Sequence, residues 1–201
     1  MTHIASNIEA KFSKPKMTEQ RRTSFQVFYK KYVDPGESAI SGVKYEYNNG
    51  IIEKTETMKI KEQNIAQNLI RRFSETQAYT ENGFLTQEVE IWTSETQWRK
   101  PDLCFLTKKQ IMEGADEMES IPRFVIEVIS TYDPINIVND KVLEYFKAGV
   151  KVLWHIFPKQ QMVYVFKSMS QIAILRADDI CSATPVIPDF EISVNDIFKK
   201  Y

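Results

Sequence analysis

The feature that most constrains the fold is an apolar run with a single acid in its middle. Residues 123–129 read Arg-Phe-Val-Ile-Glu-Val-Ile, and a run this rich in β-branched and aromatic residues predicts a buried strand. Side chains alternate between the two faces of a strand, so Glu127 shares a face with Val125 and Ile129. An unpaired carboxylate in such a place costs on the order of several kcal/mol. Glu127 therefore needs a partner, which is either a neighbouring lysine or arginine or a bound cation.

A second acid stands at the start of another apolar strand. The segment Lys100-Pro-Asp-Leu-Cys-Phe-Leu106 places Asp102 directly after a proline. If the two strands are neighbours, Asp102 and Glu127 converge, and two carboxylates without a counter-charge repel each other. A divalent cation removes this repulsion, and Mg²⁺ commonly uses one or two carboxylates together with several waters. Asp102 and Glu127 are therefore candidate metal ligands.

The segment after Glu127 predicts a helix that carries a candidate lysine. Apolar residues recur at helical spacing over residues 136–148, and Gly149 follows as a helix-ending glycine. Lys141 lies on this helix. One interpretation is an exposed lysine paired with the nearby Asp140 and Glu144. The other is that the helix packs over the strand and brings Lys141 to Glu127.

The remaining patterns predict an α/β domain with a mixed central sheet flanked by helices, because strands and helices alternate through the middle of the chain. The other expected elements are helices over residues 25–32 and 60–74, hairpins over 44–53 and 152–166, strands over 84–92 and 101–106, and one or two strands and a short helix in the tail. The first hairpin turns at Asn49-Gly50, where both residues tolerate positive φ. Residues 1–22 are expected to form a flexible arm, and residues 23–201 a single domain.

Composition excludes some classes of protein. With 43% hydrophobic and 26% charged residues and a net charge of −1, the chain has no global positive field that would attract nucleic acid. No apolar run is long enough to span a bilayer, and the N-terminus lacks the apolar core of a signal peptide. Cys104 and Cys181 have no metal-binding spacing and are expected as buried thiols. We expect a cytoplasmic protein with no membrane partner.

Four segments together resemble the Uma2 family, a group of bacterial proteins classed with PD-(D/E)xK nucleases. They are YEYNNGII from Tyr45, RKPDLCFL from Arg99, PRFVIEVIS from Pro122 and DKVLEYFKAGVKVLWHIFP from Asp140. The resemblance implies a restriction-endonuclease-like fold in which Asp102 and Glu127 bind the metal. Standard nucleases of this class carry a lysine two residues after the glutamate, where this chain has Ile129, and the resemblance gives that role to Lys141. It also places Glu46 near the site as a further candidate catalytic residue, although an exposed hairpin residue is the alternative.

The resemblance implies a metal-dependent endonuclease that uses Mg²⁺ or Mn²⁺ to hydrolyse phosphodiester bonds. The expected partner is nucleic acid, with DNA favoured, and a homodimer is expected because nucleases of this class often cut duplex DNA as two-fold pairs. Lys141 would orient the attacking water or stabilise charge developing at the phosphate. Two alternatives stay open. One is an inactive nuclease-like module for binding or assembly, and the other is a hydrolase of a smaller phosphate ester, which would have a closed pocket.

The chain departs from the family pattern at two places. Many members carry a histidine early in the second helix, where this chain has Glu62 or Gln63, and an aspartate before the next helix, where it has Ile137. These changes bear on substrate contacts more than on metal binding. We expect His155, which follows a core tryptophan, to be a structural residue.

Overall fold

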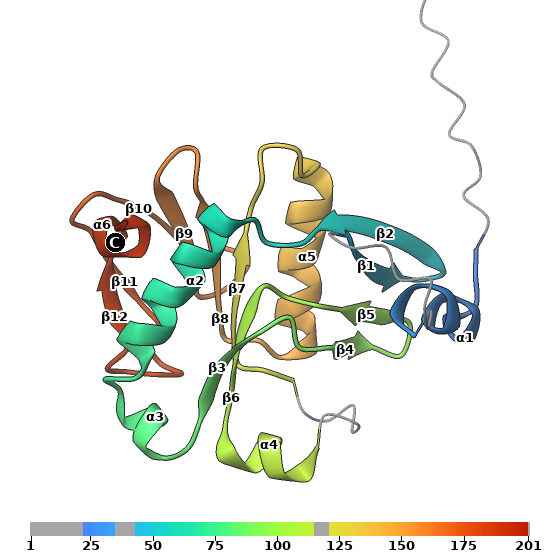
Figure 1. The fold of residues 1–201 in the computed structure, drawn as a ribbon, viewed down its shortest axis with the longest axis horizontal. Coiled ribbons are helices and arrows are strands. Elements are labelled where there is room, and N and C mark those ends of the chain that lie inside the picture. The colour runs from blue at the N-terminus through green and yellow to red at the C-terminus, as the bar shows by residue number, and fades with distance from the viewer. Residues whose placement is uncertain (1–21, 35–42, 115–120, 201) are drawn as a thin grey trace, which may run out of the picture.

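The centre of the fold is a six-stranded sheet (Figure 1). A computed structural model describes residues 22–34, 43–114 and 121–200. In order across the sheet, the strands are β10 (Ile172–Arg176), β9 (Met162–Phe166), β8 (Val152–Phe157), β7 (Phe124–Val128), β6 (Leu103–Leu106) and β3 (Phe84–Gln87). Neighbouring strands are antiparallel except for β7 and β8, which are parallel and joined through helix α5 (Ile135–Ala148). This crossover places α5 on one face of the sheet.

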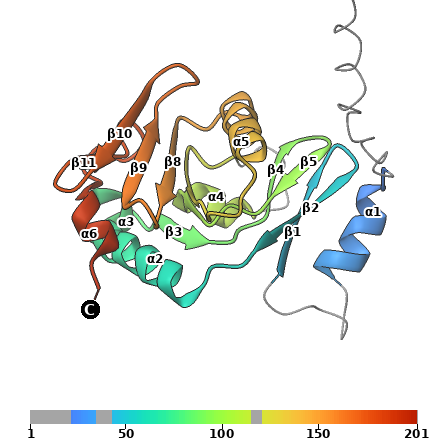
Figure 2. The same cartoon turned by 90° about the horizontal axis from the view of Figure 1, so that it is seen from above.

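A smaller, four-stranded sheet lies beside the first. Its strands, in order, are β2 (Ile51–Glu56), β1 (Val43–Asn48), β5 (Gln97–Arg99) and β4 (Ile91–Ser94). Figure 2 shows helix α1 (Phe25–Phe28) on the side of this sheet away from the six-stranded sheet, and the π-helical turn η1 (Tyr29–Val33) continues it. Phe28, Tyr47 and Trp98 form an aromatic core between α1 and the small sheet.

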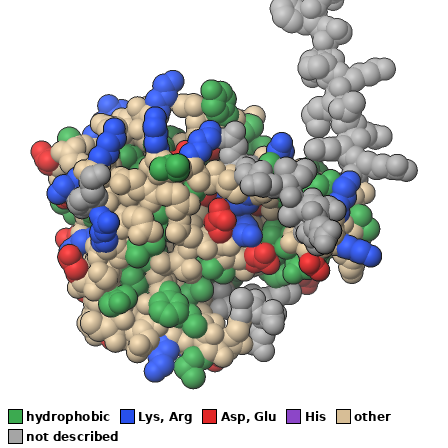
Figure 3. All heavy atoms as spheres, in the orientation of Figure 1, with side chains coloured by type: hydrophobic (Ala, Val, Ile, Leu, Met, Phe, Trp, Pro, Cys, Tyr) green, Lys and Arg blue, Asp and Glu red, His purple; other side chains and the backbone are tan. Residues whose placement is uncertain are grey.

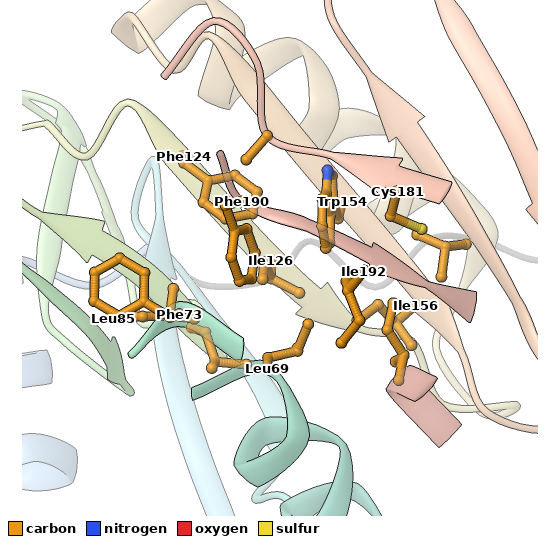
Figure 4. Packing of buried hydrophobic residues seen from close by; sticks show 14 of the residues in the cluster. Leu69, Phe73, Leu85, Phe124, Ile126, Trp154, Ile156, Cys181, Phe190 and Ile192 are labelled. Carbon is orange, nitrogen blue, oxygen red and sulfur yellow. The ribbon is translucent and has the colours of Figure 1, made fainter. Parts of the chain in front are cut away.

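Both faces of β7 are buried. On one face, α2 (Ile60–Phe73), the hairpin of β11 (Ile180–Ser182) and β12 (Glu191–Ser193), and α6 (Val194–Phe198) cover the sheet. Figure 4 shows the packing there, in which Trp154 stacks on Phe190 with ring centroids 5.6 Å apart. On the other face, Val142 and Tyr145 of α5 pack against Val125 of β7. Two short helices, α3 (Gln77–Thr80) and α4 (Lys108–Glu113), adjoin β3 and β6 in the chain.

Most elements predicted from periodicity are confirmed. The mixed sheet flanked by helices is present, and α2 and α5 begin and end within one residue of their predicted bounds. Gly149 ends α5 with a φ of 114°, and Asn49 and Gly50 adopt φ of 51° and 88° in the β1–β2 turn. Cys104 and Cys181 are buried free thiols. No helix in the described ranges is long and apolar enough to cross a bilayer.

Two strand predictions were wrong. Residues 84–92 do not form one strand, because β3 ends at Gln87 and β4 begins at Ile91 in the other sheet. Between them Glu88 has a φ of 52°, a left-handed conformation that interrupts the extended path. The tail forms three strands instead of one or two, since β10 extends the large sheet while β11 and β12 pair separately. The arm predicted over residues 1–22 lies outside the described residues except for Arg22, so that boundary stays a prediction.

Candidate active site

Asp102 and Glu127 lie side by side where the two sheets meet. Strands β6 and β7 pair with Leu103 opposite Ile126, so the next position along each strand sets Asp102 beside Glu127. Both side chains point toward α5, because Cys104 and Val125, two residues away on each strand, pack in the cluster that contains α5. The exposed fractions of Asp102 and Glu127 are only 6% and 4%. The structure thus brings the two predicted acids together.

Helix α5 carries Lys141 to the same place. Its Nζ lies 2.7 Å from Glu46 Oε2 and 3.5 Å from Glu127 Oε1. Tyr145, one turn later on α5, donates its hydroxyl to the same Glu127 oxygen at 2.7 Å. Burial alone would lower the pKa of Lys141, but the attraction of Glu127 and Glu46 raises it, so this lysine is charged. The alternative of an exposed lysine paired along its own helix is wrong.

Glu46 is completely buried in β1 and held from three directions. Besides Lys141, its Oε2 contacts Arg99 Nη1 at 3.2 Å, and its Oε1 accepts the backbone N–H of Lys100 at 3.1 Å. Burial alone would raise the pKa of Glu46, but Lys141 and Arg99 lower it to about 2. Glu46 is therefore ionised, and the alternative of an exposed hairpin residue is wrong.

Arg99 joins four elements at this junction, and sequence reasoning gave it no role. It pairs with Glu46 and Glu53 of the β1–β2 hairpin, and its Nε and Nη2 contact Glu144 of α5 at 2.9 and 2.5 Å. The guanidinium is 1% exposed. Burial alone would lower the pKa of Arg99, but the hydrogen bonds to Glu144 and the attraction of Glu46 raise it. The available signal was its place in the RKPD segment, close in the sequence to the candidate ligand Asp102.

Lys44 is the second residue that sequence reasoning missed. Its Nζ lies 2.8 Å from Asp102 Oδ1, and both side chains are at most 8% exposed. The other Asp102 oxygen accepts the backbone N–H of Val128 at 2.8 Å. Alternation along β1 could have found this lysine, because Tyr47 packs in the aromatic core while Lys44 and Glu46 share the opposite face.

Burial disfavours the charged form of both members of this ion pair, but neighbouring charges outweigh it only for Lys44. Burial raises the pKa of Asp102 to about 6, with attraction to Lys44 opposing the rise and repulsion from Glu127 adding to it. For Lys44, burial alone would lower the pKa, but Asp102, Glu127 and Glu46 together raise it. Lys44 therefore stays charged at neutral pH, whereas Asp102, with its raised pKa, takes up a proton more readily than an exposed aspartate does.

The cluster lies at the wall of a partly open cavity of about 590 Å³. The residues of the cluster that line the cavity include Lys44, Asp102, Glu127 and Lys141. His155, beside Glu127 on β8, also lines it, and its buried Nε2 has no hydrogen-bond partner in the described structure. Burial lowers the pKa of His155 to about 4, so the imidazole is neutral. Glu62, one of the two candidates for the first departure from the family pattern, and Ile137, at the second departure, line the same cavity.

The donors present fit a hard divalent cation. The contacts above join five carboxylates (Glu46, Glu53, Asp102, Glu127 and Glu144) to three cations (Lys44, Arg99 and Lys141), and five less three leaves an excess of two negative charges. Within residues 22–34, 43–114 and 121–200, no three His, Cys, Asp or Glu side chains form a ligand group. Two carboxylates completed by water are a common arrangement for Mg²⁺. Asp102 and Glu127 are the pair that reaches the cavity from neighbouring strands.

Comparison with known proteins points to nucleases. A family model described as "Uma2: Putative restriction endonuclease" matches residues 37–195. No curated protein matches the chain. Among solved structures, a "putative nuclease belonging to DUF820" from Anabaena variabilis aligns with a TM-score of 0.65 and 18% identity, over 77% of this chain and 89% of that chain. At this identity, the likeness is one of fold.

Proposed function

The chain belongs to the Uma2 family, and we propose that it is a metal-dependent endonuclease that hydrolyses the phosphodiester bonds of DNA. The observation that carries the proposal is the meeting of Asp102 and Glu127 on neighbouring strands, with Lys141 held over Glu127, at the wall of a cavity. A charged lysine beside two acids suits a reaction in which negative charge builds up on a phosphate.

Each residue of the cluster has a part in this chemistry. Asp102 and Glu127 would hold Mg²⁺ or Mn²⁺, which when bound neutralises a phosphate oxygen and activates water. Lys141 stabilises the charge that develops on the phosphate in the transition state. Tyr145 fixes the orientation of Glu127 through its donated hydrogen bond. Glu46 acts as a positioning residue, because it is fully buried and its carboxylate is taken up by Lys141 and its neighbours.

The substrate is proposed from the family and tested by a panel of phosphodiesters. In Figure 3, basic and acidic side chains of the described residues are intermingled on the face shown, without a continuous basic band. A substrate panel would hold supercoiled plasmid, single-stranded DNA, single-stranded RNA and bis(p-nitrophenyl) phosphate. We expect cleavage of DNA. Turnover of the small ester alone would favour the alternative of a small phosphate-ester hydrolase. That alternative was expected to have a closed pocket, and the partly open cavity does not exclude it.

Metal binding should weaken below pH 6. Burial raises the pKa of Asp102 to about 6, and a metal must displace the proton that this carboxylate then carries at lower pH. We expect the affinity for Mn²⁺ to fall about tenfold per pH unit below 6 and to level off above it. Calorimetric titration on both sides of pH 6 measures this. Acid unfolding through this group is not the cause, because an acid with a raised pKa in the folded state stabilises the fold as it takes up a proton. An affinity that stays level well below pH 6 would contradict the assignment of Asp102.

We also propose a homodimer, supported by the edge of the large sheet. Strand β10 lies at that edge, and its Ile172 and Ile174 are 49% and 56% exposed. Exposed apolar edge strands favour pairing with another chain. Light scattering should give twice the chain mass, and Ile174→Lys should shift the protein toward the monomer. A wild-type protein that stays monomeric at high concentration would exclude the dimer. The cytoplasmic location expected from the sequence stays a prediction.

Two observations favour the alternative of an inactive binding or assembly module. Lys44 already compensates part of the charge on Asp102 at 2.8 Å without any metal. Position 129 also holds isoleucine, where standard nucleases of this class carry lysine. Under this alternative, Mn²⁺ would not bind at micromolar to millimolar concentrations, and Lys141→Met would leave the function of the protein unchanged.

A further inference from the structure

The positively charged ammonium of Lys44 lies against Asp102, which is a proposed metal ligand. Lys44 Nζ lies 2.8 Å from Asp102 Oδ1, with side-chain exposures of 5% and 8%. Two positive charges cannot share one buried carboxylate oxygen without strong repulsion, because solvent screens them little there. A divalent cation at Asp102 therefore competes with the ammonium of Lys44 for the same oxygen.

Asp102 is the fixed member of this pair, and Lys44 is the one that can move. The second oxygen of Asp102 accepts the backbone N–H of Val128. The backbone of Asp102 lies between β5 and β6, which belong to different sheets. Lys44 has a four-carbon stem, so its ammonium can move without any change in the backbone of β1. Lys44 and Asp102 both line the cavity of about 590 Å³, so the cavity has room for the displaced ammonium.

We propose that Lys44 is an internal competitor of the metal: the Lys44–Asp102 ion pair and a cation bound to Asp102 exclude each other. The pair keeps the buried acid compensated when no metal is bound. When the cation binds, the ammonium moves into the cavity, where the phosphate of a substrate is a suitable partner. This inference rests on the proposed function, since it assumes a metal at Asp102.

The test is the affinity for Mn²⁺ alone, measured from the electron paramagnetic resonance signal of free Mn²⁺. Lys44→Met removes the competing charge and keeps most of the length of the side chain, so we expect about tenfold tighter binding or more. Lys54→Met is the matched control, because Lys54 lines the same cavity, is exposed, and makes no contact with Asp102. We expect Lys54→Met to change the affinity by less than about twofold. Lys44→Gln answers the same question if Lys44→Met does not fold.

The outcomes separate this inference from the proposed function. If Asp102→Asn abolishes Mn²⁺ binding but Lys44→Met binds no more tightly than the wild type, Lys44 is not a competitor, while the metal site stands. If the two lysine variants tighten binding equally, the effect is one of net charge and the inference is wrong. If neither the wild type nor Lys44→Met binds Mn²⁺, both the inference and the metal site fail.

Discussion

Asp102→Asn should abolish Mn²⁺ binding and lower the rate of DNA cleavage by at least about a thousandfold, a loss that corresponds to about 4 kcal/mol of transition-state stabilisation. The amide has nearly the shape of the carboxylate and can still accept the N–H of Val128. It lacks the negative charge that a hard cation requires. Calorimetric titration with Mn²⁺ and single-turnover cleavage of plasmid measure the two effects, and circular dichroism shows whether the fold is kept.

The matched control for this substitution is Asp140→Asn. Asp140 lines the same cavity but is exposed on α5, so the same chemical change is made away from the junction of the sheets. We expect cleavage by this variant to stay within about threefold of the wild type. Metal binding that survives Asp102→Asn would show that other residues hold the cation.

Arg99→Met should destabilise the protein by about 3–5 kcal/mol, because it leaves the acids that surround Arg99 without their shared cation. Arg99 is 1% exposed and pairs with Glu46, Glu53 and Glu144. Methionine fills much of the same volume, so the loss reports on charge more than on packing. Urea unfolding followed by circular dichroism measures the free energy of unfolding.

Two further variants check the cause of this loss. Arg176→Met removes an exposed arginine from β10 and should cost less than about 0.5 kcal/mol. Glu144→Gln in the Arg99→Met background should recover part of the lost stability, since it removes one uncompensated buried carboxylate. A loss below about 1 kcal/mol for Arg99→Met would mean that water reaches these acids and that the network is not what holds the junction together.

Local patterns in the sequence were sufficient for most elements of the fold. Helix α2 follows from its apolar stripe, and the β1–β2 hairpin follows from Asn49-Gly50, because both depend on residues close together in the chain. The division into two sheets could not be predicted in this way. It depends on the turn at Glu88, where a residue other than glycine adopts a left-handed conformation that local propensity disfavours.

The acids of the candidate site were easier to predict than their partners. Glu127 and Asp102 are conspicuous because each interrupts or begins an apolar strand. Lys44 and Arg99 lie in segments that mix charged and aromatic residues, where a further charged residue is unremarkable. Their pairing with Asp102 and Glu46 spans 58 and 53 residues, so it becomes visible only when the hairpin packs against the large sheet.

The ion pairs among these buried charges also hold the candidate site in position. Glu46 fixes Lys141, while Arg99 ties Glu46 to Glu144 of the helix that carries Lys141. Each charge is compensated by a group from another element, so the geometry around Asp102 and Glu127 is set by contacts that bridge both sheets and α5. Such support holds the reacting groups in place before any substrate binds.

The most direct test of the account is cleavage of supercoiled plasmid by the purified wild-type protein with Mg²⁺, Mn²⁺ or EDTA, beside Lys141→Met. We expect nicking that needs the metal, stops in EDTA, and is lost in Lys141→Met while Mn²⁺ binding is retained. No cleavage by the wild type with any metal would contradict the nuclease proposal and favour a binding module. Cleavage that continues in EDTA would contradict the role given to Asp102 and Glu127.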